Sequence, residues 1–165
     1  MGRVVVGYDG SEGAVEALRW ACEDAELRHD DVEIVHAWHE PIAGVGAPMA
    51  PLAVLDPRLF EDAARQLLAA VVRHVGEEHP SVHVTGKLVV GGAGPGIVEA
   101  ADGADLVVVG ARGRHELAEL VLGSVSQHVL HHATCPVVVM HEGRTPAAAT
   151  SEGRPSWSDS RTTMS

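Results

Sequence analysis

The sequence has 165 residues, 45% of them hydrophobic, so it is long enough and apolar enough for one folded domain with a core. Its formal net charge of −11 predicts a surface that repels nucleic acid and anionic membranes, and neither is expected as a partner. Cys22 and Cys135 have no disulfide or metal-ligand spacing, and the apolar run near the N-terminus is too short for a signal or membrane segment. These features predict a cytoplasmic protein with buried thiols.

In chain order, short apolar runs alternate with segments of helical periodicity. The predicted strands cover residues 4–8, 32–38, 82–90, 105–109 and 136–140. The predicted helices cover residues 12–28, 58–78, 97–102 and 125–132. Ser11 is placed to cap the first helix. One apolar face is predicted for the second helix, formed by Leu59, Ala63, Leu67, Val71 and Val75.

Strands that alternate with helices predict a parallel sheet, and right-handed crossovers place the helices on both faces. The predicted fold class is therefore α/β: a single doubly wound, five-stranded parallel sheet of the Rossmann-like type. Residues 40–57 are rich in proline and glycine and predict a long loop. Residues 143–165, rich in Ser, Thr and Pro without periodicity, predict a disordered tail after one domain of residues 1–142.

Two predicted strand ends carry unusual residues. They are GYDGS at 7–11 and GARGRHELAELVLGSVS at 110–126. In open parallel sheets, ligands bind at the carboxyl ends of strands, where the strand order reverses. Asp9 is explained either as a turn residue or as a ligand contact, and its carboxylate could help to hold Mg²⁺ beside phosphate oxygens.

The second of these segments has the features of an anion site. Gly110 and Gly113 permit a turn with positive φ and leave no Cβ in the way of a ligand. Gly123 comes at the start of the last helix, whose N–H groups and partial positive charge favour phosphate. Four side chains add candidate phosphate donors: Arg112, Arg114, Ser124 and Ser126. Each glycine alone is explained by an ordinary turn, but the three together favour a phosphate site.

Three other patterns give weaker indications. GGAGPGI at 91–97 is a partial dinucleotide fingerprint, and a simple tight turn explains it better. His128 and His132 share a helix face and could form half a metal site, but no third ligand follows at a recognisable spacing. The apolar run PVVVM, from Pro136 to Met140, predicts an edge strand that pairs with a second copy to form a homodimer.

The pattern G-x2-G-x9-G-S, formed by Gly110, Gly113, Gly123 and Ser124, resembles the ATP-binding motif of universal stress proteins. The resemblance covers residues 3–140 and includes the segments VVVGYDGSEGAVEAL, IVHAW, VVGGAGPGIVEAA and GSVSQHVLHHATCPVVVM. It implies a Rossmann-like sheet of the adenine nucleotide alpha hydrolase type, ATP at the strand ends, and a homodimer paired through the last strand.

Carried over residue by residue, the resemblance implies a nucleotide site. Asp9 would contact the nucleotide near its ribose or phosphates. Ala37 would lie against adenine, where family members often have valine, which implies a looser wall. Gly13 stands where serine is commoner, away from the site. The other residues predicted to hold the nucleotide are Gly7, Val109, Gly110, Arg112, Gly113, Gly123, Ser124, Val125 and Ser126.

The resulting prediction is a stress-response regulator that binds ATP with Mg²⁺ and is not a fast enzyme. Two alternatives stay open. One is a slow Mg²⁺-dependent ATPase, in which Asp9 positions the metal and Arg112 or Arg114 neutralises charge. The other is a dimeric scaffold that binds no nucleotide.

Overall fold

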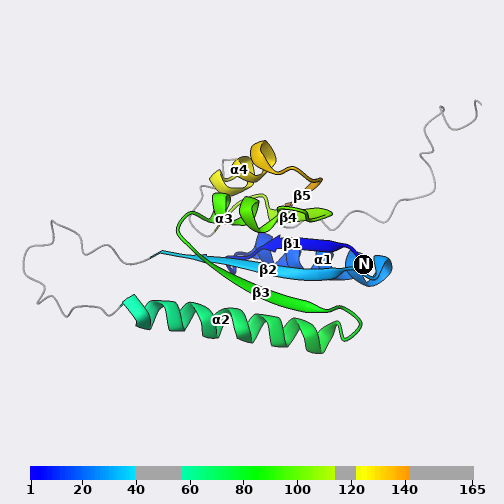
Figure 1. Ribbon diagram of the computed structural model, residues 1–165, viewed down its shortest axis with the longest axis horizontal. Helices are drawn as coiled ribbons and strands as arrows, with labels where there is room; N and C mark the ends of the chain where they lie inside the picture. The colour runs from blue at the N-terminus through cyan, green and yellow to red at the C-terminus, as the bar shows by residue number, and fades with distance from the viewer. Residues whose placement is uncertain (40–56, 114–121, 142–165) are drawn as a thin grey trace, which may run out of the picture.

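Five parallel strands form one sheet in the order β3-β2-β1-β4-β5 (Figure 1). The strands are β1 (Arg3–Gly7), β2 (Asp31–Trp38), β3 (Val84–Val90), β4 (Leu106–Gly110) and β5 (Val137–Met140). The helices are α1 (Glu12–Arg28), α2 (Pro57–Glu78), α3 (Ala93–Ala100) and α4 (Ser124–His132). From β1 the chain moves outwards to β2 and β3, then crosses to β4 and β5 on the other side. The strand order therefore reverses between β1 and β4, and the predicted fold class is confirmed.

The computed structural model describes residues 1–39, 57–113 and 122–141. The predictions for the loop up to residue 56, for Arg114 and for the tail from residue 143 onward lie outside the described residues. None of the helices in the described ranges is long and apolar enough to cross a membrane.

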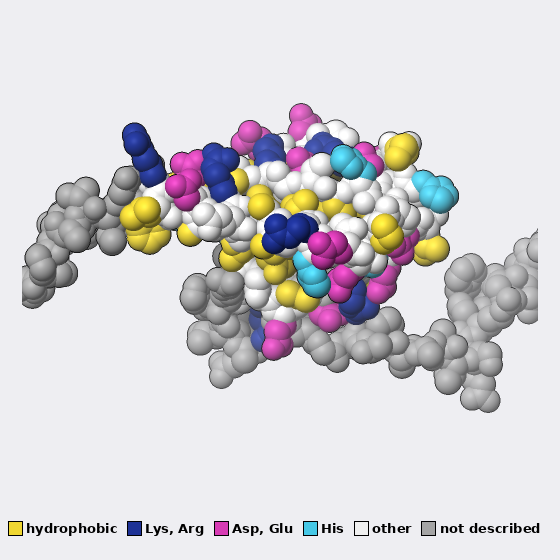
Figure 2. Space-filling model, turned by 90° about the horizontal axis from the view of Figure 1, so that it is seen from below, with side chains coloured by type: hydrophobic (Ala, Val, Ile, Leu, Met, Phe, Trp, Pro, Cys, Tyr) yellow, Lys and Arg dark blue, Asp and Glu magenta, His cyan; other side chains and the backbone are white. Residues whose placement is uncertain are grey.

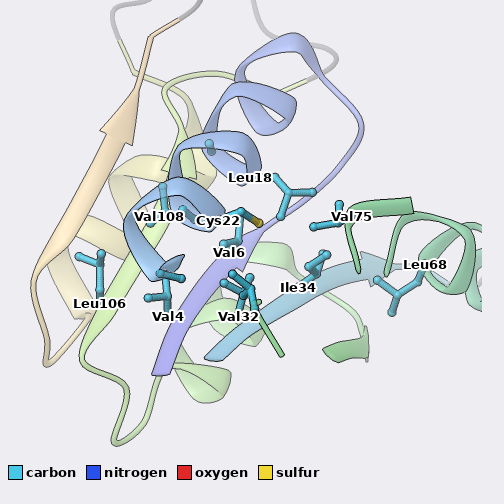
Figure 3. Close-up of a cluster of buried hydrophobic side chains, with 14 residues drawn as sticks. Val4, Val6, Leu18, Cys22, Val32, Ile34, Leu68, Val75, Leu106 and Val108 are labelled. Carbon is cyan, nitrogen blue, oxygen red and sulfur yellow. The ribbon is translucent and has the colours of Figure 1, made fainter. Parts of the chain in front are cut away.

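The sheet has a separate apolar core on each face. Alternation along β1 sends Val4 and Val6 towards α1 and α2, while Val5 points towards α3 and α4. Figure 3 shows the first of these cores, in which Leu18 and Cys22 of α1 meet the strand side chains. Each fully buried Val or Leu side chain contributes about 1.5–3 kcal/mol to folding. Burial on both faces therefore fixes the sheet as a rigid platform.

Both cysteines are held as neutral thiols. Cys22 is fully buried, and burial, followed by the nearby carboxylate of Glu26, raises the pKa of its thiol to about 12. Burial also raises the pKa of Cys135, which is partly exposed. Since only the thiolate is a good nucleophile or metal ligand, neither side chain is prepared for such chemistry at neutral pH.

Helix α1 begins in a compact turn. The Ser11 hydroxyl accepts a hydrogen bond from the Ala14 N–H at 3.2 Å, so Ser11 caps the helix as predicted. Gly10 has a φ of 79°, a left-handed conformation that suits glycine. The helix ends at His29, which also adopts a left-handed conformation and donates its backbone N–H to the Ala25 carbonyl.

The predicted apolar face of α2 is wrong in its first half. Leu68 and Val75 are buried against the sheet, whereas Leu59 is 64% exposed and Leu67 is 40% exposed. The physical reason is the spacing of the predicted set. Steps of four residues advance about 40° beyond a full helical turn, so four such steps drift about 160° around the helix. Leu59 and Val75 therefore lie on nearly opposite sides.

Helix α3 begins four residues earlier than predicted. Only Gly91, with a φ of 100°, forms the turn, and Gly92 is the N-cap. Pro95 lies in the first helical turn, where a missing N–H costs nothing. Gly94 and Gly96 lie inside the helix, where His128 of α4 and Val89 of β3 leave little room for a side chain. A Cβ at Gly94 would lie 2.9 Å from the ring of His128, so α3 packs tightly on α4.

Candidate functional site

A pocket opens at the carboxyl ends of β1 and β4, where the strand order reverses. This is the position at which open α/β sheets bind ligands. Ten of the eleven predicted site residues line it: Gly7, Asp9, Ala37, Val109, Gly110, Arg112, Gly113, Gly123, Val125 and Ser126. The structure thus brings together residues separated by more than a hundred positions in the sequence.

Ser124 is the predicted residue that does not line the pocket. It is the first residue of α4, and its side chain is exposed. Its neighbours Gly123, Val125 and Ser126 all line the pocket. Because successive residues of a helix point in directions about 100° apart, the side chain of Ser124 turns away from the pocket while the backbone of the first turn remains beside it.

Asp9 has a defined role in the turn between β1 and α1. One of its carboxylate oxygens, Oδ1, accepts a hydrogen bond from the Ser11 N–H at 2.9 Å. This contact fixes the carboxylate at the pocket wall, directly before the cap of α1. Both interpretations of Asp9 are therefore compatible with the structure, since the turn holds one oxygen while the residue lines the pocket.

Gly113 lies beside Asp9 in the lining of the pocket. A Cβ at Gly113 would be 3.1 Å from Oδ2 of Asp9, which is closer than most contacts of this kind. The expectation of positive φ is wrong for both Gly110 and Gly113, because neither adopts such a conformation. A side chain at position 113 would crowd the carboxylate of Asp9.

Gly110 leaves space for the protein itself. A Cβ at Gly110 would lie 2.8 Å from the carbonyl carbon of Gly13 and 3.0 Å from the nitrogen of Ala14. These are backbone atoms of α1, which cannot move aside as a side chain would. Gly13 is therefore not remote from the site: it lies against Gly110 and precedes Ala14, a pocket residue. The absent side chain at Gly110 lets α1 approach the end of β4.

The start of α4 is tied back to the end of β4. The carbonyl of Ala111 accepts hydrogen bonds from the Gly123 N–H at 2.6 Å and from the Ser126 hydroxyl at 2.8 Å. The Ser126 hydroxyl also lies 2.9 Å from the Gly123 carbonyl. Ser126 is 1% exposed and its single hydroxyl proton is shared between two carbonyls, so it is not a donor for a ligand. It orients the helix start instead.

Seven lining residues were missed by sequence reasoning: Tyr8, Ser11, Ala14, Val35, Ala93, Ile97 and Ala111. Val35 could have been found, because it shares a strand face with the predicted Ala37 two residues later. Ile97 could not have been found from the sequence. A Cβ at Gly7 would lie 2.5 Å from Cδ1 of Ile97, and only the packing of α3 on β1 produces this contact.

The described lining is amphipathic. An apolar wall is formed by Val35, Ala37, Ile97 and Val109. Backbone groups are presented by the segment 110–113, which we call the glycine turn, and by the first turn of α4. Asp9 and Arg112 are the charged side chains among the described lining residues, which include no histidine or cysteine. Such a wall suits a flat apolar ring, and a helix start suits an anionic group. Mg²⁺ held by Asp9 would need further oxygen atoms from the ligand.

The histidine pair on α4 forms no metal site in the described part of the chain. His128 and His132 stack, with ring centroids 4.1 Å apart and planes 18° from parallel. Nδ1 of His132 donates to the His128 carbonyl at 2.8 Å. No group of three or more His, Cys, Asp or Glu side chains that could hold a metal exists among the described residues. The two histidine rings therefore pack against each other.

The fold and the pocket together define a doubly wound α/β protein with a glycine-lined, amphipathic site at the reversal of its strand order. The chain belongs to the universal stress protein family, whose family model matches residues 1–141. It is 36% identical over 144 residues to universal stress protein Rv2623 of Mycobacterium tuberculosis, a match that covers 84% of this chain and 47% of the relative. The chain thus spans about half the length of that relative.

Two solved structures of the family share the fold and were determined with nucleotides. A universal stress protein in complex with cAMP has 26% identity and a TM-score of 0.58, with coverage of 85% of this chain and 96% of the other. The universal stress protein from Archaeoglobus fulgidus in complex with dAMP has 28% identity and a TM-score of 0.57, with coverage of 85% and 97%.

Proposed function

We propose that the pocket binds an adenine nucleotide, with ATP as the physiological ligand, and that the chain is a cytoplasmic, nucleotide-dependent regulator of the stress response. The observation that carries the proposal is the convergence of ten predicted residues on one pocket at the strand-order reversal. The complexes of two relatives with cAMP and dAMP support an adenine nucleotide as the ligand class.

The two ends of the pocket suggest how the nucleotide lies. The base packs on the apolar wall that includes Ala37 and Ile97, and the phosphates extend towards the first turn of α4. Arg112 lies in the same lining and supplies positive charge near the glycine turn. Asp9 and the phosphate oxygens then hold Mg²⁺ jointly, because this ion prefers carboxylate and phosphate ligands.

Isothermal titration with ATP, ADP, AMP, cAMP and GTP, each with and without Mg²⁺, tests the proposal. We expect adenine nucleotides to bind at least ten times more tightly than GTP, because the apolar wall offers no partner for the extra polar groups of guanine. We also expect Mg²⁺ to tighten ATP binding in the wild type and not in Asp9→Asn. Absence of binding at millimolar adenine nucleotide would reject the proposal in favour of an empty scaffold.

The binding role is proposed in preference to an enzymatic one because the described lining pairs no nucleophile with a general base. Ser11 and Ser126 both use their hydroxyl groups in structural contacts. Release of phosphate from ATP by the purified chain should match that of the Asp9→Asn variant. A rate that depends on Asp9 would instead support the slow ATPase.

We also propose a homodimer through β5, which is an edge of the sheet. The carbonyl of Pro136 accepts a hydrogen bond from Val107 of β4 at 3.0 Å, and the carbonyl of Met140 accepts one from Ala111, directly after β4, at 2.7 Å. Because bonding alternates along a parallel strand, Val138 also faces β4, whereas Val137 and Val139 turn their backbone N–H and C=O groups outwards. Antiparallel pairing of these groups with a second copy gives a two-fold dimer.

Proline at Val139 is expected to weaken this dimer at least tenfold without unfolding the protein, because it removes one outward N–H group. Proline at Val138 is the matched control, since it removes an N–H that bonds to β4 and should lower the melting temperature instead. Sedimentation velocity gives the dimer fraction, and thermal unfolding gives the stability. A Val139→Pro variant that dimerises like the wild type would exclude β5 as the interface.

A further inference from the structure

A histidine outside the pocket holds the backbone directly before Asp9. Nδ1 of His36, in β2, lies 2.8 Å from the carbonyl oxygen of Tyr8. Because a carbonyl oxygen only accepts hydrogen bonds, Nδ1 carries the proton and donates it. Tyr8 directly follows β1 and lines the pocket, whereas His36 is not among the described lining residues. His36 therefore contacts the site through the backbone of Tyr8.

His36 lies on the face of the sheet that α1 and α2 cover. Alternation along β2 places it opposite to Val35 and Ala37, which line the pocket. In the register of the sheet His36 pairs with Leu88 of β3, and both Leu88 and Tyr8 pack against the core of this face. The side chain of His36 is half-buried, which limits its movement away from the Tyr8 carbonyl.

Tyr8 is joined to β2 through both of its backbone groups. Its N–H donates to the Val35 carbonyl at 2.9 Å, which extends the pairing of β1 with β2 by one residue. Its carbonyl, held by His36, belongs to the peptide group that joins Tyr8 to Asp9. Because a peptide group is planar, a fixed carbonyl also fixes the direction in which the chain enters Asp9.

Asp9 is thus held from both sides along the chain. Before it, His36 fixes the peptide plane. After it, Gly10 turns the chain with a φ of 79°, and the Ser11 N–H donates to Oδ1 of Asp9 at 2.9 Å. A Cβ at Gly113 would lie 3.1 Å from Oδ2, so this second carboxylate oxygen lies beside the glycine turn.

We propose that His36 is a positioning residue for Asp9, and that it keeps the carboxylate where Mg²⁺ and the phosphates of the bound nucleotide meet. This inference rests on the proposed function. Mg²⁺ requires nearly ideal octahedral geometry, so a displaced carboxylate holds it less well. AMP binding without Mg²⁺ does not use this contact. His36 therefore controls the gain in ATP affinity that Mg²⁺ brings, and not the binding of the base.

Two amide substitutions separate the hydrogen bond from the ring. The amide nitrogen of asparagine is as far along the side chain as Nδ1 of histidine, whereas that of glutamine corresponds to Nε2. His36→Asn should therefore keep the bond to Tyr8, and His36→Gln should lose it. In isothermal titration we expect the gain in ATP affinity from Mg²⁺ to fall at least fivefold in His36→Gln and less than twofold in His36→Asn. The affinity for AMP should be the same in both.

His83→Gln is the matched control, because it makes the same change at an exposed histidine directly before β3, at the amino edge of the sheet. It should bind ATP and AMP like the wild type. A wild-type Mg²⁺ effect in His36→Gln would overturn the proposal. So would equal losses in the asparagine and glutamine variants, or an equal loss of AMP affinity, since the ring would then contribute only to packing.

Nuclear magnetic resonance of the ligand-free protein tests the same contact without a nucleotide. The chain has eleven histidines, and Figure 2 shows histidine side chains on the surface, so the ring signals of His36 are assigned by their absence in His36→Asn. In slightly alkaline solution we expect the ring proton on Nδ1. A proton on Nε2 instead would overturn the proposal, because the ring could then not donate to Tyr8.

The amide signal of Ser11 reports its bond to Asp9 in the same spectra. It should move in His36→Gln and remain near its wild-type position in His36→Asn. A Ser11 signal that is unmoved in His36→Gln would show that His36 does not position Asp9. If the wild type binds no adenine nucleotide, the proposed function fails, and the ring and Ser11 signals still decide whether His36 positions Asp9.

Discussion

Alanine at Gly110 is expected to lower the free energy of unfolding by about 3 kcal/mol. The added Cβ would lie 2.8 Å from the carbonyl carbon of Gly13 and 3.0 Å from the nitrogen of Ala14. Both are backbone atoms at the start of α1, so relief requires the helix to move away from β4. Urea denaturation of the two proteins gives the difference, with the midpoint and the slope fitted separately.

Gly76→Ala is the control for this measurement. Gly76 lies inside α2, and nothing would be within 4 Å of its added Cβ. The substitution should raise the stability by about 0.5–1 kcal/mol, because alanine loses less conformational freedom than glycine in a helix. If both variants change stability in the same direction, close packing against α1 is not the reason for glycine at position 110.

Valine at Gly113 is expected to weaken ATP binding at least a hundredfold and to change stability by less than about 1 kcal/mol. A Cβ there would lie 3.1 Å from Oδ2 of Asp9, on the pocket surface and not in the core. The branched side chain would fill the space beside Asp9 that the ligand is proposed to occupy. A hundredfold loss corresponds to about 2.8 kcal/mol of binding free energy.

Gly113→Ala provides a graded comparison for the same titration. Its single methyl group should cause a smaller loss of affinity than valine, if excluded volume is the cause. The circular dichroism spectra of the three proteins should coincide. An unchanged affinity in Gly113→Val would show that no ligand approaches this part of the backbone, and the proposed position of the phosphates would be wrong.

The order of strands and helices could be predicted from the sequence because each element carries its own periodicity. Five apolar runs separated by helical segments leave few alternatives to a parallel sheet, and the structure has that sheet. The face of α2 could not be predicted in the same way. A series in steps of four residues drifts around the helix from the exposed Leu59 to the buried Val75, and only the packed sheet shows which part of the series is buried.

The position of the candidate site could be predicted from the sequence, but the details of the site could not. Residues after β1 and β4 could be placed together, because parallel strands bring their carboxyl ends to one edge. The structural role of each site residue could not be predicted. Ser124 and Ser126 look equivalent in the sequence, yet Ser126 is buried and bonded to Ala111 whereas Ser124 is exposed on the first turn of α4. Such differences depend on how the first turn of α4 lies against Ala111.

Two hydrogen bonds to the Ala111 carbonyl join the start of α4 to the end of β4. Both donors, the Gly123 N–H and the Ser126 hydroxyl, belong to the protein, so the two segments that border the pocket hold each other in place before any ligand arrives. A ligand that enters the pocket therefore meets a wall that is already formed, and little of its binding free energy is lost in ordering that wall.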